Sequence, residues 1–416
     1  MRSRDSAGRS TKKRLAVYAA AFSAALSGPL SSAVAAESPK IVTLGASLQL
    51  TGADANLARY FRDGYQIAVD RINQQGGVRI GEGTYRFALK ILDNQSNINL
   101  GMQQYAELIA RDKVDFVLGP YSSSHTLNES SVAEKYRVPM VQGGGSAKQI
   151  FARGYRYVFG TAPPAEHYFS STVEMMTKLD PRIHTLALLT ADDAFDVAVR
   201  AGTKALAQEV GLEIVVDQVY PEATPNFTSL LALVKSKSPD AILLGGHEAE
   251  SLNFMREAKS LDVNARDLTS LTVGVPSHDF RAALGKDAEG VFGMTPWVIS
   301  PVMRDRWFGD GQQFAQLFQQ RFHYEPDYHV ASAVADVETF AYALEAAATL
   351  DRETVRDAIA KSDFESIYAT IRYQADGQID IPQIVIQVEN GQVVPIYTDH
   401  FLNKPNYPVP AWGKRK

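Results

Sequence analysis

Short apolar runs alternate with longer segments of helical periodicity from residue 40 onward. Residues 41–46 are almost wholly apolar, which predicts a buried strand, and the apolar positions that follow recur at helical spacing until Gly76 and Gly77. This first series predicts strands at residues 41–46, 85–92, 114–118 and 138–141, and helices at residues 57–72, 98–111 and 125–136.

A second series of the same kind begins after residue 161, with Asn226 as a candidate helix cap. It predicts strands at residues 184–189, 212–219, 241–244 and 268–273, and helices at residues 194–210, 227–236 and 248–260. Strand–helix alternation implies parallel sheets covered by helices on both faces. Two series therefore predict an α/β protein with two doubly wound, Rossmann-like lobes.

The remainder of the chain has a different pattern. Residues 311–361 are expected to be mostly helical, and residues 384–397 form a predicted hairpin around Asn390-Gly391. The tail at residues 403–416 is rich in Pro and Lys/Arg and is expected to be irregular. A length of 416 residues also favours two domains over one.

The N-terminus has the three-part layout of a secretory signal peptide, predicted to span residues 1–36. A basic segment precedes the apolar residues 15–30, and small residues offer cleavage after Ala35 or Ala36. The alternative, a membrane anchor, needs a longer apolar run than this one, which Ser, Gly and Pro interrupt.

Charge and cysteine content narrow the class of protein. The net charge is −5, and residues 1–36 carry six Lys/Arg and one Asp, so the rest of the chain is at −10. An acidic chain is a poor nucleic-acid binder. The absence of cysteine excludes disulfides, lipid-modified cysteine and thiolate metal sites. An exported protein of this kind best fits the periplasm, with secretion as the alternative.

Three loops follow predicted strand ends, where open α/β sheets bind ligands. They are residues 119–124 (GPYSSS), 142–146 (QGGGS) and 245–248 (GGHE). The serines of the first loop precede a predicted helix, whose free N–H groups and positive dipole end suit a carboxylate or phosphate. The glycine loop allows close backbone approach, and Ser146 adds a hydroxyl. The plain alternatives are a helix cap and a tight turn.

Enzyme motifs are missing from these loops. Residues 143–148 lack the spacing and the Gly-Lys-Ser/Thr ending of a phosphate-binding P-loop, and no dinucleotide, serine-hydrolase or HExxH motif occurs. His125, the His247-Glu248 pair and the Asp192-Asp193-Asp196 group are each better explained as ordinary surface or helix-start residues. We therefore expect no catalytic residue, no metal and no cofactor.

Four segments together resemble the periplasmic solute-binding proteins of the branched-chain amino-acid (leucine/isoleucine/valine-binding) family, which serve ABC importers. They are LTGADANLARYFRDGYQIAVDRINQQGGV (50–78), LIARDKVDFVLGPYSSS (108–124), VPMVQGGGSAKQIFARGYRYVFGT (138–161) and FTSLLALVKSKSPDAILLGGHEAES (227–251). The resemblance implies a type I periplasmic binding protein fold, with three crossing strands between the lobes and a ligand in the cleft. It assigns residues 37–161 and 294–375 to lobe one, and residues 162–293 and 376–402 to lobe two.

The resemblance also implies ligand-binding positions. Its carboxylate-binding residues correspond to Ser122, Gly144, Gly145 and Ser146, and its side-chain pocket position to Leu57. Phe195 takes the position of an aromatic residue in lobe two, and His247 that of a tyrosine. The family's occasional disulfide is absent, with Ser96 and Tyr121 at its positions.

One departure leaves the ligand open. The glutamate that pairs with the ligand ammonium in the family aligns with Thr272 or Val273 here. Glu248 and Asp193 are candidate substitutes for it, although neither matches its position. An unpaired buried ammonium is costly, so an aromatic or aliphatic acid without an amine is an alternative to an amino acid.

The sequence thus predicts the substrate-binding component of an ABC importer, which captures a small carboxylate solute such as a branched-chain or related amino acid. Its expected partners are the solute and an inner-membrane permease with its ATPase; no nucleic-acid partner and a monomer are expected. A ligand-sensing receptor domain and a secreted hydrolase that uses residues 122–125 are the other classes considered.

Overall fold

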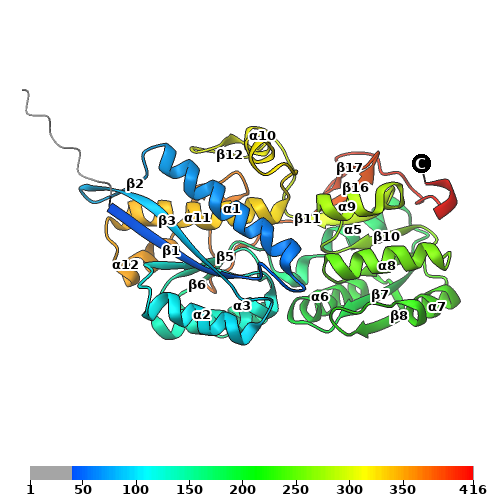
Figure 1. Ribbon diagram of the computed structural model, residues 1–416. Helices are drawn as coiled ribbons and strands as arrows, with labels where there is room; N and C mark the ends of the chain where they lie inside the picture. The colour runs from blue at the N-terminus through cyan, green and yellow to red at the C-terminus, as the bar shows by residue number, and fades with distance from the viewer. Residues whose placement is uncertain (1–39, 416) are drawn as a thin grey trace, which may run out of the picture. The chain divides into compact units, whose positions relative to one another are not determined.

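The computed structural model describes residues 40–415 as two α/β lobes (Figure 1). The predicted signal peptide, residues 1–36, lies outside the described residues. No helix within residues 40–415 combines the length and apolar character needed to cross a bilayer.

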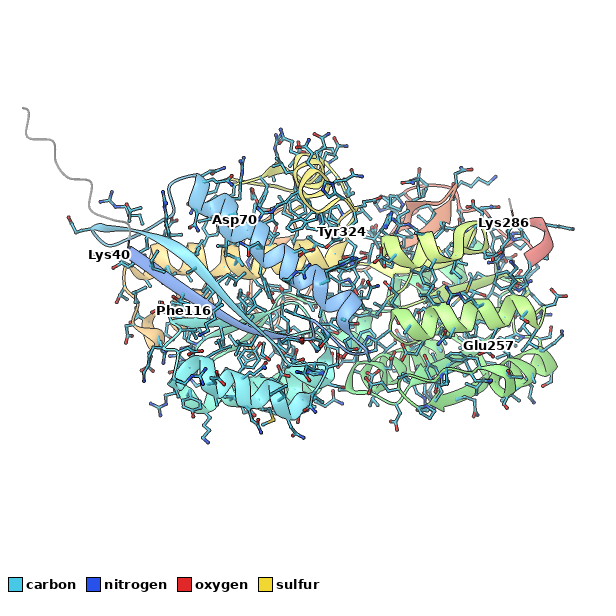
Figure 2. The ribbon with its side chains drawn as sticks, in the orientation of Figure 1. Lys40, Asp70, Phe116, Glu257, Lys286 and Tyr324 are labelled. Carbon is cyan, nitrogen blue, oxygen red and sulfur yellow. The ribbon has the colours of Figure 1, made fainter. Side chains whose placement is uncertain are left out.

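Lobe one contains a six-stranded sheet with the order β2-β3-β1-β4-β5-β6, parallel except for the β2–β3 pair. Its strands are β1 (Lys40–Leu48), β2 (Val78–Ile80), β3 (Gly83–Asp93), β4 (Phe116–Leu118), β5 (Met140–Gln142) and β6 (Val158–Gly160). Phe116, labelled in Figure 2, is fully buried on β4 and stacks on Phe340 with ring centroids 5.2 Å apart. Burial of the central strands explains why they appear in the sequence as continuous apolar runs.

Helices cover both faces of this sheet. α1 (Ala55–Gln74) and α11 (Tyr328–Ala347) pack together on one face, and α2 (Ile98–Ala110) and α3 (Ser123–Tyr136) lie on the other (Figure 1). The remaining helices of this part of the chain are α4 (Lys148–Phe151), α10 (Gly311–Phe322) and α12 (Arg352–Ile359). The helical content expected for residues 311–361 is thus present, interrupted between residues 322 and 328 and between residues 347 and 352.

Lobe two contains a seven-stranded sheet with the order β17-β16-β11-β10-β9-β7-β8. Its strands are β7 (Thr185–Ala191), β8 (Glu213–Tyr220), β9 (Ala241–Leu244), β10 (Leu268–Leu271), β11 (Phe292–Thr295), β16 (Ile384–Glu389) and β17 (Gln392–Tyr397). Its helices are α5 (Ser170–Leu179), α6 (Ala194–Val210), α7 (Thr228–Lys237), α8 (Glu248–Ser260) and α9 (His278–Leu284). The predicted hairpin forms the antiparallel pair β16–β17 at one edge.

The chain passes between the two sheets after β6, after β11 and before β16. β11 runs to Thr295, slightly past the position of return expected near residue 294. Gln378 still forms a bridge with Gly160 beside the first sheet, so the last crossing follows residue 378. The tail contains one 3-10 turn, Trp412–Lys414, and the Trp412 indole donates to the carbonyl of Val263 at 2.9 Å. The tail is therefore packed on lobe two, although it is largely irregular.

Candidate functional site

Two loops meet where β4 and β5 end. α3 begins at Ser123, and the Ser123 hydroxyl accepts hydrogen bonds from the backbone N–H groups of Ser146 at 3.0 Å and Ala147 at 3.2 Å. Gly144 lies so close to the first loop that a Cβ there would be 2.2 Å from the carbonyl oxygen of Pro120. Only glycine permits this approach, which explains part of the Gly-Gly-Gly run.

The two loops form one wall of a pocket between the lobes, here called the inner pocket. Four predicted ligand residues line it: Gly144, Ser146, Phe195 and His247. Its complete lining is Tyr121, Ser123, Gly143, Gly144, Ser146, Ala162, Tyr168, Phe195, His247, Val273, Tyr328 and His329. Its volume is only about 20 Å³, close to that of one water, so a solute enters only when the lobes separate.

The other predicted residues lie elsewhere. Leu57 lines a second space between the lobes. Ser122 is buried just before α3, its side chain makes no capping hydrogen bond, and it lines neither space. The Gly145 N–H donates to the Gln142 side chain at 2.6 Å, and the Thr272 hydroxyl donates to the carbonyl of Gly246 at 2.8 Å. Gly145 and Thr272 thus hold the shape of loops and do not face the pocket.

Aromatic rings make up much of the inner pocket. Tyr168 and Phe195 meet edge to face with centroids 4.8 Å apart. Burial raises the pKa of Tyr168 to about 12, against a lowering by the Ser146 and Tyr328 hydroxyls. The rings favour a solute with apolar atoms, while the hydroxyls offer it donors.

Several polar contacts join the lobes around this pocket. Tyr121 and Nδ1 of His247 are 2.5 Å apart, and Arg59 pairs with Asp279 at 2.7 Å. The Asn56 amide also donates to Glu248. These contacts involve α1 and the loop before α3 on one side, and the starts of α8 and α9 on the other.

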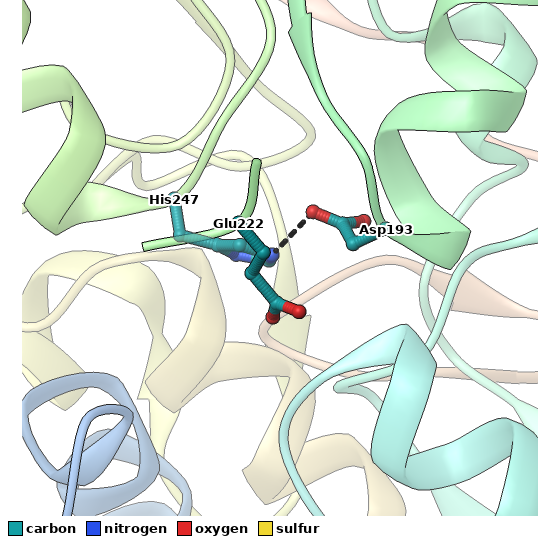
Figure 3. A group of neighbouring side chains, drawn as sticks. All are labelled: Asp193, Glu222 and His247. Carbon is teal, nitrogen blue, oxygen red and sulfur yellow. Dashed lines mark ion pairs between the residues drawn. The ribbon is translucent and has the colours of Figure 1, made fainter. Parts of the chain in front are cut away.

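His247 forms an ion pair with Asp193, which lies in the same lobe (Figure 3). Asp193 caps α6, with Oδ1 accepting from the N–H groups of Phe195 and Asp196, and Oδ2 lies 3.3 Å from Nε2 of His247. Burial works against the charged imidazole, yet the hydrogen bond and charge of Asp193 raise the pKa of His247 to about 10. Burial likewise opposes ionisation of Asp193, but His247 lowers its pKa to about 2. The pair is therefore ionised at neutral pH.

The second space, here called the outer chamber, has a volume of about 570 Å³ and shares His247 with the inner pocket. Its walls come from the starts of α1, α2, α3 and α8 and from the residues after β8. The acidic residues that line it are Asp54, Glu222, Glu248 and Glu250. Asp193, Glu222 and His247 also bring one ligand atom each within 4.8 Å of one another, which makes them a candidate cation-binding group.

Comparison with known proteins identifies the fold. Residues 41–392 match the family described as periplasmic binding proteins. The chain belongs to this family. It is 24% identical over 393 residues to Leu/Ile/Val-binding protein homolog 7 of Brucella abortus (strain 2308), covering 90% of this chain and 96% of that protein.

Solved structures agree with the type I periplasmic binding protein fold. The branched-chain amino acid transporter substrate binding protein LivJ from Streptococcus pneumoniae, in complex with isoleucine, has a TM-score of 0.75 at 20% identity, covering 85% of this chain and 98% of that chain. An ABC transporter solute-binding protein from R. palustris, in complex with benzoate, has a TM-score of 0.74 at 19% identity, covering 86% and 96%. At these identities the likeness establishes the fold alone.

Membership of this family gives the chain its general class. The family and these neighbours are solute-binding proteins and not enzymes. One neighbour binds an amino acid and another an amine-free acid, so membership leaves the ligand open.

Sequence reasoning missed several residues of this periplasmic binding protein's cleft. Tyr168, Tyr328 and His329 line the inner pocket but lie far along the chain from the two loops. Tyr121 lies inside the GPYSSS loop, so its place at a strand end could have identified it as a pocket residue. Tyr328 and His329 begin a helix that is buried along most of its length, and no local motif distinguishes them.

Proposed function

We propose that this protein is the periplasmic substrate-binding component of an ABC importer and that it captures a small carboxylate solute between its lobes. The observation that carries the proposal is the meeting of Gly144, Ser146 and the charged His247 in one pocket. A glycine N–H and a hydroxyl bind an anionic oxygen directly, and the charge of His247 attracts it, although both ring nitrogens of His247 already face Asp193 and Tyr121.

Within this proposal, the Ser146 hydroxyl and the Gly144 backbone N–H contact the carboxylate. The Ser146 N–H is taken by Ser123, so Ser146 contributes its side chain. The aromatic rings of Tyr168 and Phe195 contact the apolar part of the solute. Because the inner pocket is nearly filled, the solute enters an open form and the lobes close around it.

The proposal also covers export, oligomeric state and delivery of the solute. Residues 1–36 direct export to the periplasm and are then removed. The released protein acts as a monomer and delivers its solute to an inner-membrane permease and its ATPase. Size-exclusion chromatography with light scattering tests the monomer, and N-terminal sequencing of the exported protein tests cleavage after Ala35 or Ala36.

Matched pairs of solutes test the carboxylate. L-leucine and L-leucinamide differ at the carboxylate, as do benzoate and benzamide. Solutes that bind the native state stabilise it, by about 2.7 kcal/mol at a hundred times Kd. We expect at least one carboxylate to raise Tm and its amide to have little effect. Ser146→Ala should weaken binding about tenfold, and Ser131→Ala on α3 serves as a control. Equal shifts with acid and amide would contradict the proposal.

An amine-free aromatic acid is a second candidate solute. The ring-lined inner pocket favours it, and so does the absence of a glutamate at residues 272 and 273. Calorimetric titration with benzoate and L-leucine distinguishes the two candidate solutes. A pocket that binds the amino group of an amino acid should bind benzoate weakly, because its hydrogen-bonding groups would have no partner on benzoate.

A further inference from the structure

We infer that the outer chamber binds a cationic group at the far end of the captured solute, an ammonium or a guanidinium. The inference rests on the proposed function, in which the solute's carboxylate lies in the inner pocket. His247 lines both spaces, so a solute of moderate length reaches from one to the other past this residue.

Two of the acidic side chains in the outer chamber are buried and incompletely paired. Glu248 is 6% exposed and Glu250 is 3% exposed. In each, one carboxylate oxygen has a partner, Asn56 for Glu248 and the Ala223 N–H at 2.8 Å for Glu250. The other oxygen, Oε2, has no hydrogen-bond partner among residues 40–415 in either case. A buried carboxylate oxygen without a partner is costly, and a cationic ligand would supply the partner.

The chamber's own positive charge does not balance these carboxylates. None of the residues described as lining it is Lys or Arg. His247 is paired with Asp193, while burial lowers the pKa of His125 to about 4 and leaves that ring neutral. His125 therefore provides no charge to Asp54, although Nε2 lies 3.8 Å from its carboxylate.

Helix N-termini offset only part of the negative charge. Four helices, α1, α2, α3 and α8, begin at the chamber, and each terminus is equivalent to about half a positive charge. Their sum is smaller than the charge of four ionised carboxylates. Burial is the main cause that raises the pKa values of Asp54, Glu222 and Glu248, and nearby carboxylates raise them further, whereas His247 lowers those of Asp54 and Glu222 and hydrogen bonds lower that of Glu248.

The size of the chamber favours an organic cation over a bare metal ion. A volume of about 570 Å³ accommodates a side chain, and Leu57 and Leu252 provide apolar contact for its methylene groups. The structure therefore points to solutes such as basic amino acids, whose carboxylate and distal cation are separated by several carbons. A divalent metal at Asp193, Glu222 and His247 is the competing occupant that the test must separate.

Two matched pairs of solutes test whether the outer chamber binds a cationic group. L-arginine and L-citrulline differ in the charge of the end group, and L-lysine and L-norleucine differ in the presence of the ammonium. Calorimetric titration of the purified protein should show at least tenfold tighter binding of one cationic member than of its neutral partner. Glu248→Gln and Glu250→Gln should each reduce that ratio severalfold, whereas Glu213→Gln, at the exposed start of β8, should leave it unchanged.

The possible outcomes distinguish failure of this inference from failure of the proposed function. Equal affinity within both pairs, or no binding of either basic amino acid, overturns the inference and leaves carboxylate binding to be judged by the acid–amide pairs. Binding of agmatine as tight as that of L-arginine contradicts the carboxylate proposal instead, because agmatine lacks that group. Stabilisation by Zn²⁺ or Ca²⁺ alone, lost in Glu222→Gln, would assign the acidic group to a metal and overturn the organic cation.

Discussion

The hydroxyl of Tyr121 lies 2.5 Å from Nδ1 of His247, and this contact joins the loop after β4 to the loop after β9. His247 is charged at neutral pH, so both ring nitrogens carry protons. Nε2 then faces the Asp193 carboxylate in an ion pair, 3.3 Å from Oδ2, and Nδ1 donates to the Tyr121 oxygen. A single charged side chain of lobe two thereby holds a residue of lobe one across the cleft.

Tyr121→Phe is expected to weaken solute binding about tenfold or more. The substitution removes one charge-assisted hydrogen bond of about 1.5–3 kcal/mol and keeps the ring that packs on Phe61 and His329. Most of the change should appear as faster dissociation, measured by stopped-flow fluorescence. Tyr136→Phe, at an exposed end of α3, is the control. Unchanged dissociation would mean that the contact does not hold the lobes together.

Ser123→Ala is expected to destabilise the protein more than Ser122→Ala. The Ser123 hydroxyl accepts from two buried N–H groups, and each unsatisfied group costs about 1–3 kcal/mol. The Ser122 side chain makes no capping bond, so its loss costs less. Urea denaturation compares the two variants. The reverse order of stability would contradict the role of Ser123 as the serine that supports the glycine loop.

Ser122 and Ser123 also show which features could be predicted from the sequence and which could not. Hydrophobic periodicity predicted the long elements and placed both donor loops at strand ends, because buried strands and amphipathic helices have distinctive periods. Which serine faces the glycine loop depends on backbone dihedral angles at the start of α3, and Ser122 is extended there. Side-chain direction of this kind is not encoded in residue spacing.

Short elements and long-range contacts were not predictable for other reasons. β2 and β6 have three residues each, too few to show a period, and unlike the equally short β4 and β5 they were not predicted from the neighbouring apolar residues. The outer chamber was missed because Asp54, Glu222 and Glu250 come from three separate segments, two loops and the first turn of α8, and only the fold brings them together. The sequence showed that the family's glutamate was absent, but not that other carboxylates surround the cleft.

Gly144→Ala is expected to destabilise the protein by a few kcal/mol and to abolish solute binding. Its Cβ would lie 2.2 Å from the carbonyl oxygen of Pro120 and 2.9 Å from Cα of Tyr121. Both are backbone atoms, so the loops must move apart, and overpacking of this kind costs about 1–3 kcal/mol or more. Gly413→Ala, which has nothing within 4 Å, is the control. Thermal unfolding and titration check both effects, and wild-type behaviour would contradict the close approach.

His247→Gln is expected to change how stability depends on pH. The folded-state pKa of His247 is raised to about 10 from an ordinary value near 6.5, so its contribution is complete below pH 6.5 and is lost as pH rises through 10. The contribution of Asp193 to stability has the opposite pH dependence, but its pKa is lowered to about 2, so this contribution changes only at pH values well below 6.5. Wild type should therefore lose stability relative to the variant between pH 6.5 and 10, by at most about 1.4 kcal/mol for each pKa unit of the shift. Denaturation at several pH values measures this difference, with His184→Gln, at an exposed position before β7, as the control. Parallel pH profiles of wild type and His247→Gln would show that the Asp193 pair does not stabilise the imidazolium.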